Sequence, residues 1–116
     1  MTDSLIRLRD ELREFAAERD WDQFHSPRNL ATALAVEAAE LLEPFQWLSE
    51  DQGRALPAET RAAVEEEMAD VLLYLVRLAD KLDVDLEQAA RAKMLRNAER
   101  YPVEKARGSN RKYDEL

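Results

Sequence analysis

The chain has 116 residues, which suits one compact domain and leaves little room for a second. It contains two glycines, four prolines and no cysteine, which excludes a disulfide framework and thiol catalysis and favours helices throughout. Its net charge of −8 argues against general binding to a nucleic-acid polymer.

The composition also bears on where the protein works. No apolar run approaches the ~20 residues needed to cross a bilayer, and the first residues lack the apolar centre of a signal peptide. The absence of cysteine suits a reducing compartment. We therefore expect a cytoplasmic protein without a membrane partner.

The first half of the chain predicts two helices. The first runs from residue 2 or 3 to about residue 19, with apolar side chains on one face: Leu5, Leu8, Leu12 and Phe15. After an aromatic linker over residues 20–25, Ser26 and Pro27 provide a helix cap and a first-turn proline. The second helix is expected to continue to about residue 43, where Pro44 closes it.

The second half predicts two more helices after a polar loop over residues 49–56. Pro57 opens a third helix that reaches about residue 82, and Asp85 can cap a fourth that ends near residue 100. Four helices with short connections predict an all-α four-helix bundle. Because the run over residues 72–76 is apolar around the helix, we expect the long helices to associate between subunits.

Charge is distributed unevenly along the chain. Residues 1–90 hold 9 basic and 21 acidic side chains, whereas residues 91–116 hold 8 basic and 4 acidic ones. The expected organisation is one all-α domain over residues 1–104 and a basic C-terminal tail over residues 105–116. Such a tail is either a solubilising end or a contact for a small polyanion, and charge alone does not decide between them.

Two pairs of acidic residues three positions apart are the most informative feature: Glu37 with Glu40, and Glu67 with Asp70. Residues at this spacing project from one face of a helix. Glu37 falls on the apolar row of the second helix, and Asp70 stands in an otherwise uncharged run, where a buried carboxylate needs a partner or a metal. An antiparallel pair of helices would gather all four carboxylates around a cation. Taken singly, each acid has an alternative role as a solvated surface residue or as the partner of a neighbouring cation.

Other polar and aromatic residues also have two interpretations. Trp21, Phe24 and Trp47 either anchor the core or an interface, or stack against a base. His25 either packs at the start of the second helix or contacts a substrate. The fourth helix carries a basic stripe that is either solvated or, at Lys93, in contact with phosphate: Lys93, Arg96 and Arg100.

The ordered set of motifs resembles the MazG-like all-α nucleoside triphosphate pyrophosphatases. The spacing is Glu-x-x-Glu, 26 residues, then Glu-x-x-Asp. Several segments resemble the dCTP pyrophosphatase branch of that superfamily over essentially the whole chain: residues 15–25, 27–30, 45–47, 70–75, 93–94, 97, 100–102 and 111–113. One position departs from the branch, because Leu12 stands where close relatives carry a substrate-contacting histidine.

The resemblance implies Mg²⁺-dependent hydrolysis of nucleoside triphosphates, chiefly dCTP and modified dCTP analogues, to the monophosphate and pyrophosphate. It implies a homotetramer. The apolar helices predict that subunits associate but not how many, so a homodimer is the alternative. By resemblance, the metal ligands are Glu37, Glu40, Glu67 and Asp70. Also by resemblance, the nucleotide is bound by Trp21, Asp22, Gln23, Phe24, His25, Trp47, Tyr74, Lys93, Asn97 and Tyr101, and we favour base stacking for Trp47.

The residues themselves suit this chemistry. Mg²⁺ prefers hard oxygen ligands, whereas zinc usually takes the nitrogen or sulfur ligands that this chain lacks apart from His25. There is no catalytic triad and no glycine-rich phosphate loop, so a metal-activated water is expected, with Glu37 or Glu40 as general base. The alternative function is a non-catalytic helical assembly or partner-binding module whose acid pairs are structural.

Overall fold

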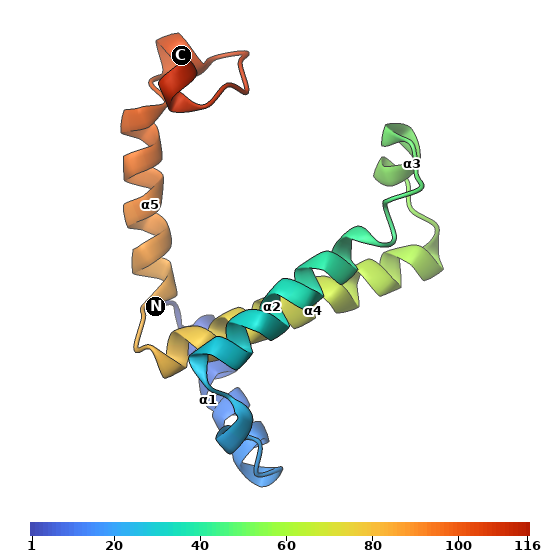
Figure 1. Cartoon of the computed structure of the whole chain (residues 1–116), viewed down its shortest axis with the longest axis vertical. Coiled ribbons are helices and arrows are strands. Elements are labelled where there is room, and N and C mark those ends of the chain that lie inside the picture. Colours follow the sequence, from blue (N-terminus) through green and yellow to red (C-terminus); the bar gives the residue numbers. More distant parts are fainter. The chain divides into compact units, whose positions relative to one another are not determined.

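The computed structural model describes all 116 residues and contains no strand. The predicted all-α class and the four long helices are confirmed: α1 (Asp3–Glu18), α2 (Pro27–Leu42), α4 (Ala58–Lys81) and α5 (Leu86–Arg100) (Figure 1). Four short elements complete the chain: η1 (Asp22–Phe24), α3 (Glu50–Arg54), α6 (Val103–Ala106) and η2 (Tyr113–Glu115). None of the helices combines the length and the apolar character that crossing a membrane requires.

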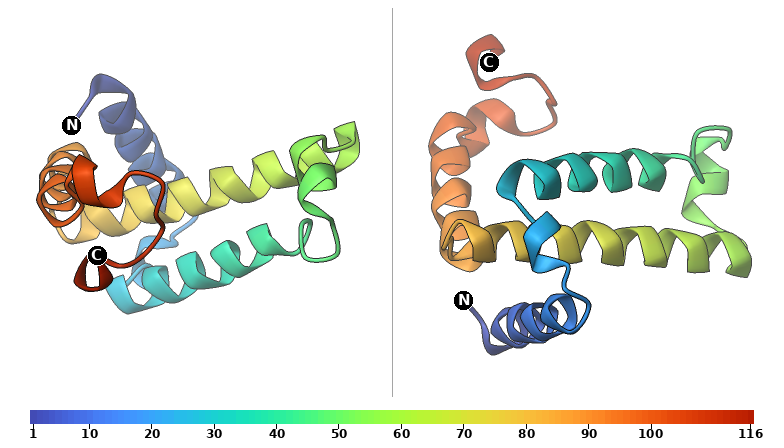
Figure 2. Two further views of the ribbon diagram at one scale, coloured as in Figure 1. Left: turned by 90° about the horizontal axis from the view of Figure 1, so that it is seen from above. Right: turned by 60° about the horizontal axis from the view of Figure 1, so that its bottom comes forward.

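The chain forms two compact units. One comprises Thr2–Val84 and holds α1 to α4; the other comprises Asp85–Leu116 together with Met1 and holds α5, α6 and η2. In the first unit α2 and α4 run side by side in opposite directions, and α1 packs on α4 (Figure 1). Helix α4 therefore lies between α1 and α2 (Figure 2).

The helix starts follow from local capping. The Ser26 hydroxyl accepts a hydrogen bond from the backbone N–H of Asn29, with Pro27 in the first turn, and Asp85 caps α5 through the N–H of Gln88. Helix α3 starts with a capping box between Ser49 and Gln52, in which each side chain accepts a hydrogen bond from the backbone N–H of the other residue. The prediction of a loop over residues 49–56 is therefore wrong for Glu50–Arg54, which form the short helix α3.

The ends of α1 and α4 share one motif. Asp20 and Asp83 adopt left-handed φ angles of 55° and 54°, which Asp tolerates better than most residues. In each case the next residue reaches back, because the N–H of Trp21 bonds to the Ala16 carbonyl at 2.9 Å and that of Val84 to the Ala79 carbonyl at 2.8 Å. This pattern satisfies carbonyls that the end of a helix leaves free and reverses the chain.

The side chains that are fully covered in the single chain are few. Leu30 on α2 and Val76 on α4 are the largest, each only 1% exposed. Several large apolar side chains on the same two helices remain exposed: Val36, Leu42, Met68, Leu72 and Leu75. Exposed apolar side chains gathered on two neighbouring helices are a feature of surfaces that bind other chains.

The basic tail predicted from residue 105 begins inside a helix. Helix α6 spans Val103–Ala106, and η2 lies near the C-terminus. The Tyr101 and Tyr113 rings meet edge to face, with centroids 6.2 Å apart. The division at residues 104 and 105 stays a prediction.

Candidate active site

A cluster of carboxylates lies between the two long antiparallel helices. Glu37 comes from α2, and Glu67 and Asp70 come from successive turns of α4. One carboxylate oxygen from each lies within 4.8 Å of the others. Glu37 Oε2 and Glu67 Oε2 are buried and have no hydrogen-bond partner. Buried oxygens of this kind need a donor or a cation, so the three residues fit a metal site made of oxygen ligands.

The electrostatics of the cluster also favour a cation. The Glu67 carboxylate can accept a hydrogen bond from Glu37 only when Glu37 is protonated, and this contact is the main cause that raises the pKa of Glu37 above its usual 4.5. Partial burial and the charge of Asp70 act in the same direction. Glu40, one turn along α2, has its pKa raised chiefly by the adjacent Glu37. Without a cation, Glu37 and Glu40 therefore hold protons more tightly than isolated carboxylates do.

An apolar pocket of about 240 Å³ opens beside this cluster. Its walls come from α1, the linker after it and α4: Leu12, Phe15, Ala16, Trp21, His25, Asp70, Leu73, Tyr74 and Arg77. Sites that enclose whole drug-sized ligands span roughly 300–1,000 Å³, so this volume suits one flat ring system. Asp70 belongs both to the pocket wall and to the carboxylate cluster.

The end of α1 places Trp21 in this pocket. The reversal at Asp20 turns the chain back, so that the Trp21 ring meets the Phe15 ring edge to face with centroids 5.8 Å apart. The His25 ring also meets the indole edge to face, with its centroid 6.5 Å away. Trp21 remains 44% exposed, which leaves ring surface free for a ligand.

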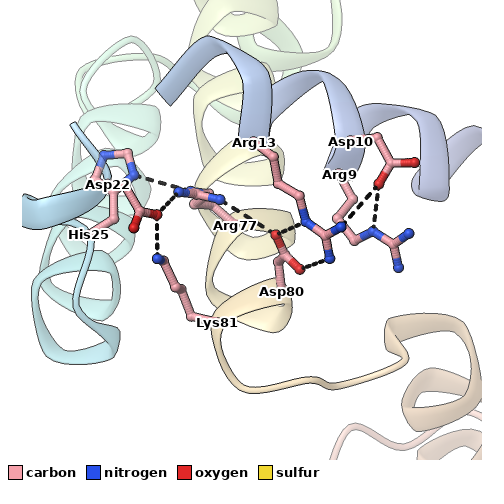
Figure 3. A network of polar contacts seen from close by, with 8 residues as sticks. All are labelled: Arg9, Asp10, Arg13, Asp22, His25, Arg77, Asp80 and Lys81. Atoms are coloured by element: carbon pink, nitrogen blue, oxygen red, sulfur yellow. Dashed lines mark hydrogen bonds and ion pairs between the residues drawn. The ribbon is translucent and has the colours of Figure 1, made fainter. Parts of the chain in front are cut away.

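A polar network adjoins the pocket through His25 and Arg77, which line it (Figure 3). The guanidinium of Arg77 on α4 donates to His25 Nδ1 at 3.1 Å and to Asp22 Oδ1 at 2.6 Å. Lys81 also donates to Asp22, and the Arg13 guanidinium on α1 donates two hydrogen bonds to the Asp80 carboxylate. The network ties α1 and the linker to α4, because its members come from all three.

This architecture has a counterpart in a known family. The sequence profile of the MazG-like family matches residues 32–116, which is most of the chain and includes both acidic pairs. The chain belongs to the MazG-like family. The resemblance inferred from the motifs is therefore confirmed at the level of the family.

Individual MazG-like relatives are similar over most of the chain. The dCTP pyrophosphatase 1 of Mus musculus is 55% identical and that of Homo sapiens 52% identical, each over 105 residues that make up 89% of this chain. The chain spans 62% of the length of these curated relatives. Among solved structures, a pyrophosphatase from Archaeoglobus fulgidus superposes with a TM-score of 0.81 at 41% identity, over 88% of this chain and 95% of the other.

The structure brings some of the predicted site residues together. Glu37, Glu67 and Asp70 converge, and Glu40 adjoins Glu37 without joining the three-way cluster. Trp21, His25 and Tyr74 share the pocket with Asp70. For all of these, a role in a MazG-like active site remains a prediction.

Other predicted residues lie outside this pocket. Trp47 is 86% exposed, Phe24 is exposed, and the Gln23 amide bonds to Asp20. The Asp22 carboxylate faces Arg77 and Lys81. The remaining three residues belong to the second unit, Lys93 and Asn97 on α5 and Tyr101 at its C-cap, and their role also stays a prediction.

Sequence reasoning missed several pocket residues, above all Arg77. Phe15 and Leu73 follow the apolar pattern of any core, so nothing in that pattern marks them as pocket walls. Position 12 had a signal from the resemblance alone, since close relatives carry a substrate-contacting histidine there. Arg77 had one weak signal, since it lies three positions after Tyr74 and seven after Asp70 on the same helix face. Its partner His25 is 52 positions away along the chain, and local periodicity cannot reveal a contact of that range.

Proposed function

We propose that the protein hydrolyses nucleoside triphosphates, chiefly dCTP and modified dCTP analogues, to the monophosphate and pyrophosphate in a Mg²⁺-dependent reaction. One observation carries the proposal: Asp70 lines the base-sized pocket and also belongs to the carboxylate cluster. A nucleotide whose base fills the pocket would then hold its phosphates at the cluster. The names of the relatives, dCTP pyrophosphatase 1 and pyrophosphatase, point to the same reaction.

The proposed metal ligands are Glu37, Glu40, Glu67 and Asp70. All are carboxylates, the hard oxygen donors that Mg²⁺ prefers. The buried oxygens of Glu37 and Glu67 that have no hydrogen-bond partner have lone pairs available for the ion. When bound, Mg²⁺ would neutralise the triphosphate, polarise the α-phosphorus and lower the pKa of a coordinated water.

Either Glu37 or Glu40 is the proposed general base. A carboxylate beside the metal can accept a proton from the coordinated water that attacks the α-phosphorus. Glu40 adjoins Glu37 one turn along α2, so its carboxylate is placed near a water held at the cluster. No nucleophilic side chain is required, since the attacking group is water.

The base is proposed to lie in the pocket against Trp21, His25 and Tyr74. Aromatic rings stack on bases with little regard to sequence, and such stacking contributes about 1–3 kcal/mol per base. Trp47 is available for a second stacking contact, because its ring is almost fully exposed in the single chain. The remaining proposed contacts to the nucleotide are Asp22, Gln23, Phe24, Lys93, Asn97 and Tyr101.

The protein is further proposed to act as a homotetramer or homodimer in the cytoplasm. Support for association comes from the exposed apolar side chains of α2 and α4. The basic segment over residues 105–116 is proposed to contact the triphosphate, with removal of unwanted nucleotides from the pool as the role. Neither a nucleic-acid polymer nor a membrane is proposed as a partner.

The test is ³¹P NMR of the purified protein with Mg²⁺ and each of a panel of triphosphates, including dCTP, 5-methyl-dCTP and dUTP. The proposal expects dCMP and pyrophosphate from dCTP, and loss of turnover in Glu40→Gln with the helical circular dichroism intact. Products dCDP and phosphate would contradict cleavage at the α-phosphorus. A protein inert toward every triphosphate would support the alternative, a non-catalytic helical assembly or partner-binding module.

A further inference from the structure

Arg77 is the one charged side chain that the first unit fully buries. It is 6% exposed, and its guanidinium donates to three partners: His25 Nδ1 at 3.1 Å, Asp22 Oδ1 at 2.6 Å and Asp80 Oδ2 at 3.4 Å (Figure 3). A buried arginine is costly unless it is paired, and two carboxylates meet that requirement here. The neutral His25 ring does not offset the charge of Arg77, so the hydrogen bond between them needs a separate explanation.

The chemistry of the two side chains fixes the protonation of the imidazole. A guanidinium only donates hydrogen bonds and keeps its protons at any physiological pH. His25 Nδ1 must therefore offer its lone pair, which leaves the single proton of the neutral ring on Nε2. An imidazolium would set an N–H of His25 against the N–H of Arg77.

The surroundings of His25 keep the ring neutral. Burial lowers the pKa of His25, and the charges of Arg77 and Lys81 lower it further against the weaker pull of Asp22. Asp22 is held by Arg77 and Lys81, and Asp80 is held by Arg13 and Arg77. Neither carboxylate is therefore free to draw a second proton onto the ring.

The other ring nitrogen is the one that a ligand meets. Nε2 has no hydrogen-bond partner within the chain and is not sealed from solvent. The His25 ring lines the pocket and packs edge to face on Trp21. A ring system lying against Trp21 would thus find one N–H donor with a fixed direction at the pocket wall.

We propose that Arg77 is a positioning residue that holds His25 in the Nε2–H form, so that the imidazole donates a hydrogen bond to an acceptor atom of the base in the pocket. The inference rests on the proposed function, and it specifies the ligand as a flat heterocycle with a carbonyl or ring-nitrogen acceptor at that point. A pyrimidine has such atoms. A ring with a donor at the same point is rejected, because two N–H groups would face each other unpaired.

The first test uses the fact that His25 is the only histidine in the chain. Long-range ¹H–¹⁵N spectra of the intact protein therefore report the tautomer of this ring without ambiguity. The wild type is expected to show the Nε2–H form alone from pH 6 to 8, without added nucleotide. A spectrum of the Nδ1–H form, or an imidazolium at pH 7, would overturn the inference.

Arg77→Met removes the guanidinium that contacts His25 and tests whether that contact sets the tautomer. It keeps much of the side-chain volume, and each carboxylate retains a cation, Lys81 for Asp22 and Arg13 for Asp80. The variant is expected to show mixed tautomers, whereas Arg13→Met, which removes a network arginine that does not touch His25, is expected to keep the wild-type spectrum. If Arg77→Met does not fold, the tautomer seen in the wild-type spectrum still tests the inference.

The second test measures binding of dCMP, which requires no turnover. Arg77→Met and His25→Ala are each expected to weaken dCMP binding by roughly three- to tenfold, the effect of one hydrogen bond. The double variant is expected to be no weaker than His25→Ala, because both changes remove the same contact. Additive losses would overturn the inference.

The two proposals fail separately. A locked tautomer and a non-additive loss of dCMP binding in a protein that hydrolyses nothing would overturn the proposed reaction and leave the role of Arg77 standing. Hydrolysis of dCTP with a freely tautomerising His25 would do the reverse.

Discussion

Glu37 on α2 and Glu67 on α4 face each other across the antiparallel helix pair, and each buries one carboxylate oxygen that has no hydrogen-bond partner. Two like charges placed in this way oppose the packing of the helices that carry them. The arrangement makes physical sense when a divalent cation occupies the space between them. It therefore predicts how the protein responds to losing a charge and to gaining a metal.

Replacing Glu67 with Gln is expected to stabilise the metal-free protein. The change keeps the shape of the side chain and removes one of three converging negative charges, so the melting temperature without divalent cations should rise. Added Mg²⁺ should raise the melting temperature of the wild type, because it binds the folded state, and should raise that of the variant much less. Differential scanning fluorimetry across a Mg²⁺ titration measures both effects.

Glu66→Gln is the control for this experiment. Glu66 adjoins Glu67 on α4 but is exposed and lies outside the cluster. Its substitution should leave the Mg²⁺ response unchanged. Equal Mg²⁺ responses in the wild type and Glu67→Gln would mean that the cluster does not bind the ion.

The stability of the metal-free protein should depend on pH through the same cluster. The pKa values of Glu37 and Glu40 are raised above the usual 4.5, so the folded state holds these protons more tightly than the unfolded state. Their contribution to stability is fully present below about pH 4.5 and is lost as the pH rises through the raised folded values. Asp80 acts in the other direction, because Arg13 lowers its pKa below 3.8 and its contribution is lost only in more acidic solution.

The difference in melting temperature between Glu37→Gln and the wild type isolates the cluster from Asp80. This difference should be largest near neutral pH and should shrink toward zero as the pH falls to about 4.5. Saturating Mg²⁺ should abolish the gain shown by the variant. A difference that stays constant from pH 4 to pH 8 would show that Glu37 carries no raised pKa.

Trp21→Ala should weaken nucleotide binding by about 1–3 kcal/mol, the range for loss of a stacking contact. Its ring forms a wall of the pocket, so the loss should appear in the Kd for dCMP as well as in the KM for dCTP. Leu82→Ala is a suitable control, because Leu82 is an exposed apolar side chain of the same unit that neither lines the pocket nor belongs to the proposed nucleotide site. Unchanged dCMP binding in Trp21→Ala would place the base elsewhere.

The sequence alone predicted the long helices and three of the four acids that meet between them, Glu37, Glu67 and Asp70, for physical reasons. Apolar periodicity and caps such as Ser26 and Asp85 are local signals, and both caps appear as predicted. The carboxylates converge because the i,i+3 spacing and the antiparallel connection of two helices leave little freedom. Helix α3 was missed because its glycine and polar residues suggest a loop, while the Ser49–Gln52 capping box is enough to start a helix.

The pocket could be predicted only in part. Tyr74 and Asp70 lie on one face of α4, which spacing indicates, but the position of Trp21 depends on the left-handed Asp20 that turns the chain back over α1. That turn has no glycine to mark it. Arg77 was missed because its partners Asp22 and His25 come from a distant segment, and the contact exists only after α1 and α4 have packed.

Leu30→Ala should lower the free energy of unfolding by about 2–5 kcal/mol, the usual cost of deleting a buried leucine side chain. Leu30 is almost completely covered where α2 meets α4. Chemical denaturation followed by circular dichroism measures the loss. Leu82→Ala is the matched change at an exposed leucine, and a comparable loss there would indicate that Leu30 is no more buried in solution than Leu82.

A crystal structure of the protein with Mg²⁺ and a dCTP analogue that carries an imido bridge between the α- and β-phosphates tests the central claim most directly. The account predicts Mg²⁺ bound to carboxylate oxygens of Glu37, Glu67 and Asp70 and to phosphate oxygens, with the base against Trp21. A triphosphate bound elsewhere, with no ion between those carboxylates, would contradict it.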